Sequence, residues 1–243
     1  MLKPLRQLID LLLPARCAAC DVEVGSRDTL CAVCAGSLVP GAGVSCPGCG
    51  LVYLTPPEGG CGHRCGECLR DPPAFDRARA GFAYGGALSD AISRWKNAPD
   101  HTLGVGLGRL LVDELQATGW RPAEGALVVP VPSHRRQLKR RGFNPAGVTA
   151  RALSRAFGLP LRGTALTLRR PLPPSKGMGR KARVRRIRGA FALRERNGLR
   201  GRPVVLVDDV MTTGATVREV ARVLRRGGVA SCEVVVLARA PRD

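Results

Sequence analysis

The sequence predicts an α/β fold, a parallel sheet with helices on both faces, preceded by a small cysteine-rich domain. The apolar runs at 126–131 and 204–207 lack polar alternation, as expected of strands covered on both faces. Each run is followed by a helical pattern, and this alternation is typical of a doubly wound sheet. Eight cysteines in Cys-x-x-Cys pairs precede the alternation. We therefore expect a main α/β domain over 75–243.

The remaining elements are expected from their periodicity. Residues 75–84 alternate in a way that is compatible with a strand, and a helix is expected to follow the turn that ends at Thr216. Further helices are predicted at 88–96, 103–118 and 145–157, and further strands at 166–168 and 231–237. Cys232 is expected in the core of the last strand.

The first 16 residues predict an amphipathic helix. Leucine and isoleucine recur there at helical spacing, and Arg6, Gln7 and Asp10 interrupt the other face. A secretory signal would not carry these polar residues in its apolar region. No apolar run reaches the ~20 residues of a membrane span. A cytoplasmic protein without a membrane span is therefore expected.

The region 17–70 predicts a double zinc ribbon. Two cysteines separated by two residues can bind one zinc ion, and a second pair completes a closed, structural site. The four pairs are Cys17 and Cys20, Cys31 and Cys34, Cys46 and Cys49, and Cys65 and Cys68. Sequential and crossed pairing both fit the spacing, and Cys61 and His63 are spare potential ligands. A disulfide scaffold is the alternative, but the repeated spacing and the absence of a signal peptide favour reduced thiols.

The positive charge of the chain is concentrated in one block. Of 39 Lys and Arg residues, 21 fall within 133–202, where Glu195 is the only acid. Such a block predicts a polyanionic partner, namely nucleic acid, pyrophosphate or an anionic membrane surface, although an Arg-rich composition is also typical of a high-GC genome. Within the block, 132–144 is expected to be a basic loop. Residues 169–188 predict either a mobile loop that closes over a charged substrate or a solvated linker.

The stretch 204–216 predicts a site for a sugar phosphate. Asp208 and Asp209 come at the carboxyl end of the second apolar run, where ligands bind in open α/β sheets. The Thr-Thr-Gly-Ala-Thr turn that follows offers hydroxyl and backbone N–H groups to an anion at the start of a helix. The carboxylates would repel phosphate, so they suit sugar hydroxyls or a metal-bridged group.

This stretch closely resembles the signature of type I phosphoribosyltransferases, which bind phosphoribosyl pyrophosphate (PRPP). The resemblance implies that Asp208 and Asp209 are catalytic and engage the ribose hydroxyls, with the turn on the 5′-phosphate. It also implies magnesium bound with PRPP. The PRPP-binding set is Val207, Asp208, Asp209, Met211, Thr212, Thr213, Gly214, Ala215 and Thr216.

The order of the motifs along nearly the whole chain looks like the ComF family of competence-associated proteins. The shared parts are the double Cys-x-x-Cys module, Pro-Pro-Ala-Phe-Asp at 72–76, R-R-G-F-N at 140–144 and the PRPP motif. Pro145, Ser175 and Arg186 depart from the Gln, Gln and Asn that the family commonly has, which weakens the carry-over of transferase activity. The expected pyrophosphate-binding residues are Lys96, Arg135, Arg136, Arg140 and Arg141.

The family resemblance implies a role in natural transformation, in which imported single-stranded DNA is handled inside the cell. The first hypothesis is a phosphoribosyltransferase that acts on PRPP with an acceptor that the sequence does not identify. Its general base would have to be His134 or His101. The second is a non-catalytic nucleic-acid-binding or PRPP-sensing module on the transferase fold. Either would work with single-stranded DNA and a partner such as a competence helicase.

Overall fold

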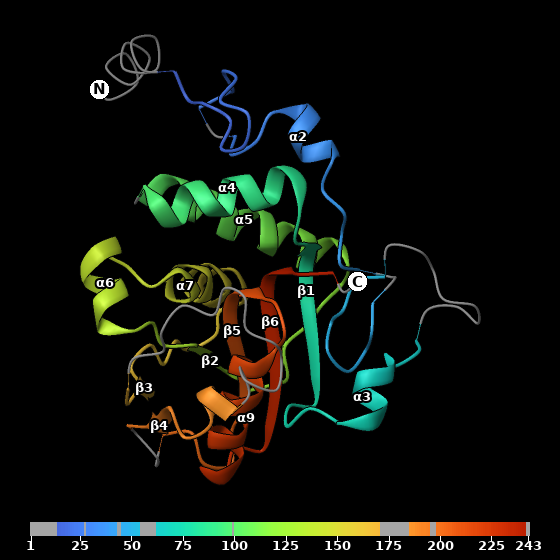
Figure 1. Cartoon of the computed structure of the whole chain (residues 1–243), viewed down its shortest axis with the longest axis vertical. Coiled ribbons are helices and arrows are strands. Elements are labelled where there is room, and N and C mark those ends of the chain that lie inside the picture. The colour runs from blue at the N-terminus through green and yellow to red at the C-terminus, as the bar shows by residue number, and fades with distance from the viewer. Residues whose placement is uncertain are drawn as a thin grey trace.

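A four-stranded parallel sheet forms the centre of the molecule (Figure 1). The computed structural model describes residues 14–26, 28–42, 45–53, 62–98, 100–170, 185–194 and 198–241. The strand order is β1-β6-β5-β2, and all three neighbouring pairs run parallel. The fold class predicted from the sequence is therefore confirmed. The strands are β1 (Arg77–Ala83), β2 (Leu127–Pro130), β5 (Pro203–Met211) and β6 (Ser231–Arg239).

Helices cover both faces of the sheet. One face packs against α4 (Gly86–Asn97), α5 (His101–Ala117) and α7 (Pro145–Phe157). The other face packs against α9 (Ala215–Arg226) and a small antiparallel pair, β3 (Leu166–Leu168) with β4 (Phe191–Leu193). Side chains of β5 alternate between the two cores, because successive strand residues point to opposite faces.

The predicted elements agree with this arrangement except in the basic block. Helix α7 and strand β3 have the predicted bounds, and β6 extends two residues beyond its prediction. The expected loop 132–144 is wrong in part, because it contains helix α6 (Arg135–Arg141). His134 caps this helix through Nδ1, which accepts from the Arg136 amide at 3.2 Å, and Gly142 ends it with a φ of 77°.

Two other expectations fall largely outside the described residues. Residues 1–13 of the predicted amino-terminal helix lie outside the described residues. Residues 14–16 are not helical, and Arg16 pairs with Glu23 in an antiparallel bridge. Of the basic segment 169–188, residues 171–184 are outside the description. Strand β4, which follows this segment, was not predicted from the sequence.

The cysteine-rich region docks on the α/β core in two places. Its first part contains α2 (Ala32–Gly36) and lies on α4, where Arg94 Nη1 reaches Asp21 Oδ1 at 2.8 Å. Its second part contains α3 (Gly66–Arg70) and lies beside β1 (Figure 1). Between them, 39–41 hydrogen-bonds to the edge of β1, and a Cβ on Gly41 would meet the Ala80 carbonyl oxygen at 2.2 Å. This close approach requires glycine.

Within the described part of the chain, none of the helices combines the length and the apolar character that crossing a membrane requires.

Candidate functional site

A cavity of about 730 Å³ opens at the carboxyl end of β5. Its walls come from segments far apart in the sequence, namely the end of α4, the segment after β2, α6, the β3–β4 pair and the loop between β5 and α9. This is the edge of a parallel sheet at which ligands bind in open α/β folds. The topology thus brings the predicted acidic pair and the predicted phosphate loop to one cavity.

Asp208 and Asp209 lie at the floor of the cavity, just beyond the point where β5 ends its ladder with β2 at Val207. Burial raises the pKa of Asp208 well above its usual range, and the neighbouring charge of Asp209 raises it further. For Asp209, burial opposes ionisation, but the attraction of Lys96 outweighs it and leaves the pKa lowered. Asp209 is therefore the ionised member of the pair, and Asp208 binds its proton more tightly.

Lys96 reaches this floor from the last turn of α4. Its Nζ forms an ion pair with Asp209 Oδ2, and the two side chains are 25% and 14% exposed. The preceding residue, Trp95, is buried and stacks on Phe143 with ring centroids 5.3 Å apart. This stacking fixes the end of α4 against the segment that follows α6, so the position of Lys96 is set by packing.

The loop between β5 and α9 forms another wall of the cavity. Gly214 has a φ of 74°, which favours glycine, and it is the residue before α9 begins. Thr213 Oγ1 accepts a hydrogen bond from the Ala215 amide at 3.4 Å. The first backbone N–H groups of a helix have no hydrogen-bond acceptor within the helix and can therefore donate to a ligand. Thr212, Thr213 and Thr216 line the cavity. Such a helix start favours an anion.

Helix α6 contributes a basic rim. Arg140 and Arg141 line the cavity together with Gln137, as the spacing of three and four residues on a helix allows. Arg141 Nε is buried and has no hydrogen-bond partner in the described part of the chain. Partial burial lowers the pKa of Arg141, and Arg140 lowers it further, while Asp209 raises it. A donor in this setting is suited to an anionic ligand.

The cavity includes some of the residues predicted from the sequence and omits others. Asp208, Asp209, three threonines of the loop, Lys96, Arg140 and Arg141 line it. Val207, Met211 and Ala215 are buried and do not line it, and Gly214 provides the turn. Arg135 and Arg136 are exposed and are not among the lining residues. Their role in pyrophosphate binding stays a prediction.

Several lining residues had no signal in the sequence. They are Leu168, Ile187, Phe191, Ser133 and Gln137. Asn144 donates to the Val131 carbonyl at 2.9 Å and accepts from Ser133 Oγ at 2.8 Å, which holds the two ends of the α6 segment together. Of the two candidate histidines, His134 lines the cavity and His101 does not.

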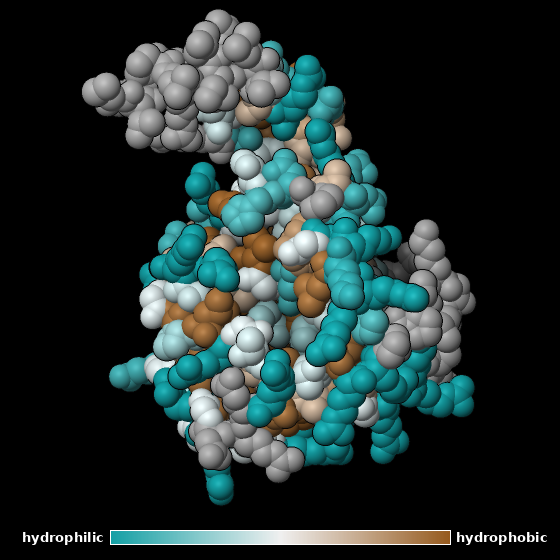
Figure 2. Space-filling model, turned by 90° about the vertical axis from the view of Figure 1, so that its left-hand side faces the viewer, coloured by the Kyte–Doolittle hydropathy of each residue, from teal (hydrophilic) through white to brown (hydrophobic). Residues whose placement is uncertain are grey.

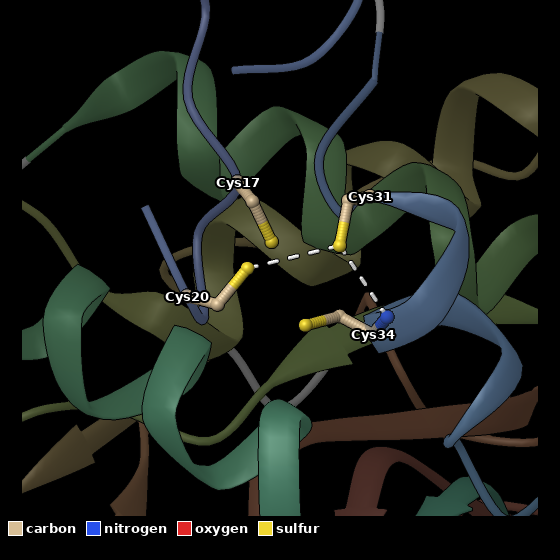
Figure 3. A group of neighbouring side chains, drawn as sticks. All are labelled: Cys17, Cys20, Cys31 and Cys34. Carbon is tan, nitrogen blue, oxygen red and sulfur yellow. Dashed lines mark hydrogen bonds between the residues drawn. The ribbon is translucent and has the colours of Figure 1, made fainter. Parts of the chain in front are cut away.

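The first four cysteines converge on one point. Cys17, Cys20, Cys31 and Cys34 point toward one another, with their sulfur atoms within 4.8 Å of each other (Figure 3). The distance from Cys20 Sγ to Cys31 Sγ is 3.7 Å. Zn–S bonds of about 2.3 Å in a tetrahedron place sulfur atoms about 3.8 Å apart. The geometry fits one structural zinc ion.

The second four, Cys46, Cys49, Cys65 and Cys68, form an equally close group. Their sulfur atoms also lie within 4.8 Å of each other, and Cys49 Sγ and Cys65 Sγ are 3.6 Å apart. The pairing along the chain is therefore sequential, not crossed. Cys61 lies outside the described residues, and His63 does not belong to either group.

The protonation of the second group also favours a metal. The Cys49 thiol donates to Cys46 and lowers the pKa of Cys46 to about 4, while burial raises the pKa of Cys68 to about 12. Four adjacent sulfur atoms cannot all ionise in a buried place without a cation, because like charges repel. A divalent zinc ion would satisfy all four thiolates. The residues present thus fit two Cys₄ zinc sites.

We expect two zinc ions per chain in the purified protein. Cys20→Ser and Cys49→Ser should each lower the content to about one, because three thiolates bind zinc less tightly than four. The measurement is elemental analysis together with titration of free thiols after chelation. Cys232→Ser is the matched control, since Cys232 is buried in β6 outside both groups. An unchanged zinc content in both ligand variants would contradict the assignment.

We expect Asp208→Asn to stabilise the fold and Asp209→Asn to destabilise it at neutral pH. The first variant removes a carboxyl group whose pKa is raised by burial, and the second leaves Lys96 without its partner. The free energy of unfolding should therefore be higher in Asp208→Asn and lower in Asp209→Asn than in the wild type.

The pH dependence gives the sign of the Asp208 effect. A raised folded pKa means that wild-type stability falls as the pH rises above the unfolded value of about 4, so the gain is present at neutral pH. It should shrink as the pH falls toward that value. Urea unfolding at two pH values measures this dependence. A loss of stability in Asp208→Asn at neutral pH would show that the carboxylate is not under strain.

Comparisons with known proteins agree with this geometry. A family described as phosphoribosyl transferase domain matches residues 138–243, and one described as double zinc ribbon domain matches 8–69. The DNA utilization protein YhgH of Salmonella typhi is 31% identical over 234 residues, which cover 94% of this chain and 99% of that protein. Competence protein F of Haemophilus influenzae is 31% identical over 224 residues, covering 86% and 96%.

Among solved structures, glutamine phosphoribosylpyrophosphate amidotransferase from B. subtilis is similar to part of this chain. The match covers 56% of this chain and 26% of the amidotransferase chain, at 23% identity and a TM-score of 0.37. Two curated relatives thus exceed 30% identity over almost their entire length. The cysteine pairs form the two Cys₄ groups, and residues of the PRPP motif line the cavity. The chain belongs to the ComF family of competence-associated proteins.

Proposed function

We propose that this protein binds PRPP with magnesium in the cavity at the end of β5 and acts in the cellular use of imported DNA. The observation that carries the proposal is the placement of an acidic pair, a threonine-rich helix start and a basic rim around one cavity. A sugar that carries phosphate groups at two ends needs anion-binding groups for the phosphates and acceptors for the sugar hydroxyls. The cavity volume of about 730 Å³ is in the range of ligand pockets.

Each wall has its part of the ligand. The loop 212–216 would hold the 5′-phosphate, and Asp208 with Asp209 would bind the ribose hydroxyls. Arg140 and Arg141 would face the pyrophosphate, and the unpartnered Nε of Arg141 supports this orientation. Magnesium prefers oxygen ligands, so Asp208 and Asp209 are the residues that would hold it, and it would offset the negative charge of the bound phosphates.

Transfer to an acceptor is the corresponding reaction. A nucleophile would form a bond to C1 of the ribose while the bond from C1 to the pyrophosphate oxygen breaks. The basic rim would stabilise the charge on the leaving pyrophosphate. His134 lines the cavity, and it would be the residue that accepts a proton from the acceptor. The names of the relatives, DNA utilization and competence, support a setting in DNA uptake. The reduced thiols that zinc requires persist in the cytoplasm.

The first test is binding of PRPP with magnesium, measured by calorimetry. Asp208→Asn combined with Asp209→Asn should lower the affinity at least tenfold, because hydrogen bonds to charged groups contribute about 1.5–3 kcal/mol each. Asp113→Asn on α5 is a matched control, since Asp113 is exposed and does not line the cavity. Equal affinity of the double variant and the wild type would refute the assignment of the acidic pair.

A second function, binding of single-stranded DNA, is favoured by one observation. Arg135, Arg136 and Lys139 are exposed on α6 and do not line the cavity, so they are available to a polyanion. The face of the molecule that carries α6 is bordered by projecting hydrophilic side chains (Figure 2). Contacts to the phosphate backbone would make such binding dependent on salt. A DNA-uptake protein such as a helicase would be a further partner on this surface.

Replacing Arg135, Arg136 and Lys139 together by Gln should weaken binding of single-stranded DNA. The slope of log affinity against log salt should fall by about 2, since each phosphate contact on a single strand contributes about 0.7. Fluorescence anisotropy with a labelled oligonucleotide at several salt concentrations measures the slope. Arg151, Arg155 and Arg162 are also exposed and are the control set. An equal loss of slope in both sets would show that α6 is not a specific contact.

A further inference from the structure

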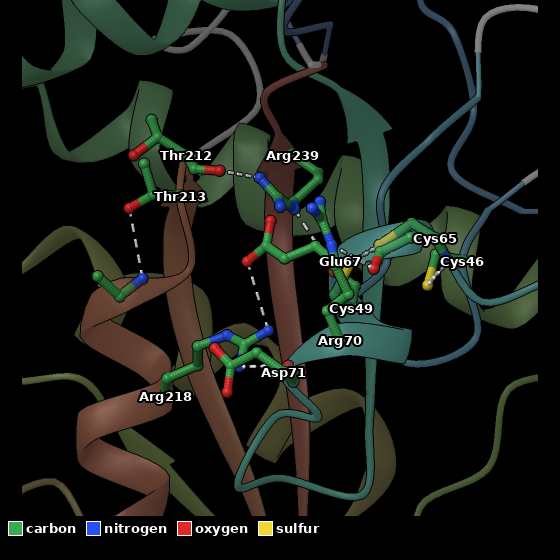
Figure 4. A network of polar contacts seen from close by, with 12 residues as sticks. Cys46, Cys49, Cys65, Glu67, Arg70, Asp71, Thr212, Thr213, Arg218 and Arg239 are labelled. Carbon is green, nitrogen blue, oxygen red and sulfur yellow. Dashed lines mark hydrogen bonds and ion pairs between the residues drawn. The ribbon is translucent and has the colours of Figure 1, made fainter. Parts of the chain in front are cut away.

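Arg239 connects the second cysteine group to the phosphate loop. It ends β6, and the residue is completely buried. Its Nη1 donates to the Met211 carbonyl at 2.8 Å and to the Thr212 carbonyl, and its Nε donates to the Cys49 carbonyl at 3.4 Å. Met211 ends β5, Thr212 begins the loop, and Cys49 is a predicted zinc ligand. The guanidinium group of Arg239 thus connects the second cysteine group to the phosphate loop (Figure 4).

Arg218 makes a second connection from the other end of the loop. It lies in the first turn of α9, where its amide donates to the Gly214 carbonyl at 2.9 Å. Its buried side chain donates to the Asp71 carbonyl at 3.0 Å and to Asp71 Oδ2 at 3.2 Å, and its Nη2 lies 3.5 Å from Glu67 Oε1. Both partners belong to α3 or to the residue that follows it. The loop is therefore held on both sides by one small module.

The cysteine group fixes that module. Cys65 is the residue immediately before α3, and Cys68 lies within it. A helix of five residues is too short to be stable by itself in water. The core of the module consists of Cys46, Cys49, Cys65, Cys68 and Leu51, with Tyr53 packed against it. Binding of zinc would therefore supply most of the energy that holds Glu67, Asp71 and the Cys49 carbonyl in place.

We infer that the second Cys₄ site sets the conformation of the phosphate loop, with Arg239 and Arg218 as the positioning residues. The inference rests on the proposed function in one respect, namely that the loop is the phosphate site. Loss of zinc from this site would release the two arginines from their partners and loosen residues 208–219. The first Cys₄ site packs on α4 and, within the described part of the chain, forms no hydrogen bond or ion pair with the loop, so its loss would leave these residues ordered.

The experiment is hydrogen exchange of the full-length, zinc-loaded protein, followed on peptides that cover residues 208–219. In Cys68→Ser the exchange of these peptides should accelerate at least tenfold, with the zinc content reduced to about one per chain. Cys34→Ser is the matched control, because it removes a ligand from the first site. Peptides from the centre of β6 report whether the sheet stays folded.

The arginines are tested in the same way. Arg239→Met should accelerate exchange at 208–219, and Arg239→Lys should restore part of the protection, because lysine keeps the charge but not the forked donors. Arg225→Met is the control, since Arg225 lies at the other end of α9 and pairs with Asp76. Should Arg239→Met unfold the sheet, Arg218→Gln and Cys68→Ser decide the question.

Affinity for PRPP separates this inference from the proposed function. Coupling predicts that Cys68→Ser and Arg239→Met bind PRPP at least tenfold more weakly, with the Asp208 and Asp209 side chains intact. Wild-type protein that fails to bind PRPP would refute the proposed function, while exchange at 208–219 would still report on the coupling. Unchanged exchange in Cys68→Ser, at reduced zinc content, would overturn the inference.

Discussion

The cavity depends on the need to keep two adjacent carboxyl groups at the end of a buried strand. Asp208 and Asp209 follow four buried residues of β5, and burial disfavours the charge on both. Lys96 offsets one charge by pairing with Asp209. Since Lys96 comes from α4, far away in sequence, the acidic pair also requires α4 to end at this edge. The stack of Trp95 on Phe143 holds it there, whereas the ion pair of Arg94 with Asp21 is exposed and contributes little.

The buried carboxyl group of Asp208 lowers the stability of the fold, and binding of a ligand accounts for its presence. A carboxyl with a raised pKa is not explained by folding, because a neutral residue at position 208 would fit the buried end of β5 at lower free energy. Perturbed carboxyl groups in a cleft are typical of functional sites. The two cysteine groups have a different origin, since a module with so small a core requires its metal in order to fold.

Periodicity and motif order were sufficient to predict the parallel sheet, the bounds of α7 and the floor of the cavity. The reason is that buried parallel strands and amphipathic helices depend on local patterns of apolar residues, as in 126–131 and 145–157. Helix α6 was missed because five of its seven residues are basic and it has no apolar stripe. Arg218 and Arg239 were missed because their partners lie 147 or more residues away in the chain, or are backbone carbonyls.

The two faces of α6 explain how one basic block can serve two kinds of anion. Gln137, Arg140 and Arg141 turn toward the acidic floor, where a bare polyanion would be repelled by Asp209 and a ribose with its own hydroxyl groups would not. Arg135 and Lys139 are exposed and do not line the cavity. A small phosphorylated sugar and a strand of nucleic acid would thus contact the same helix on different sides. Binding of one therefore does not require displacement of the other.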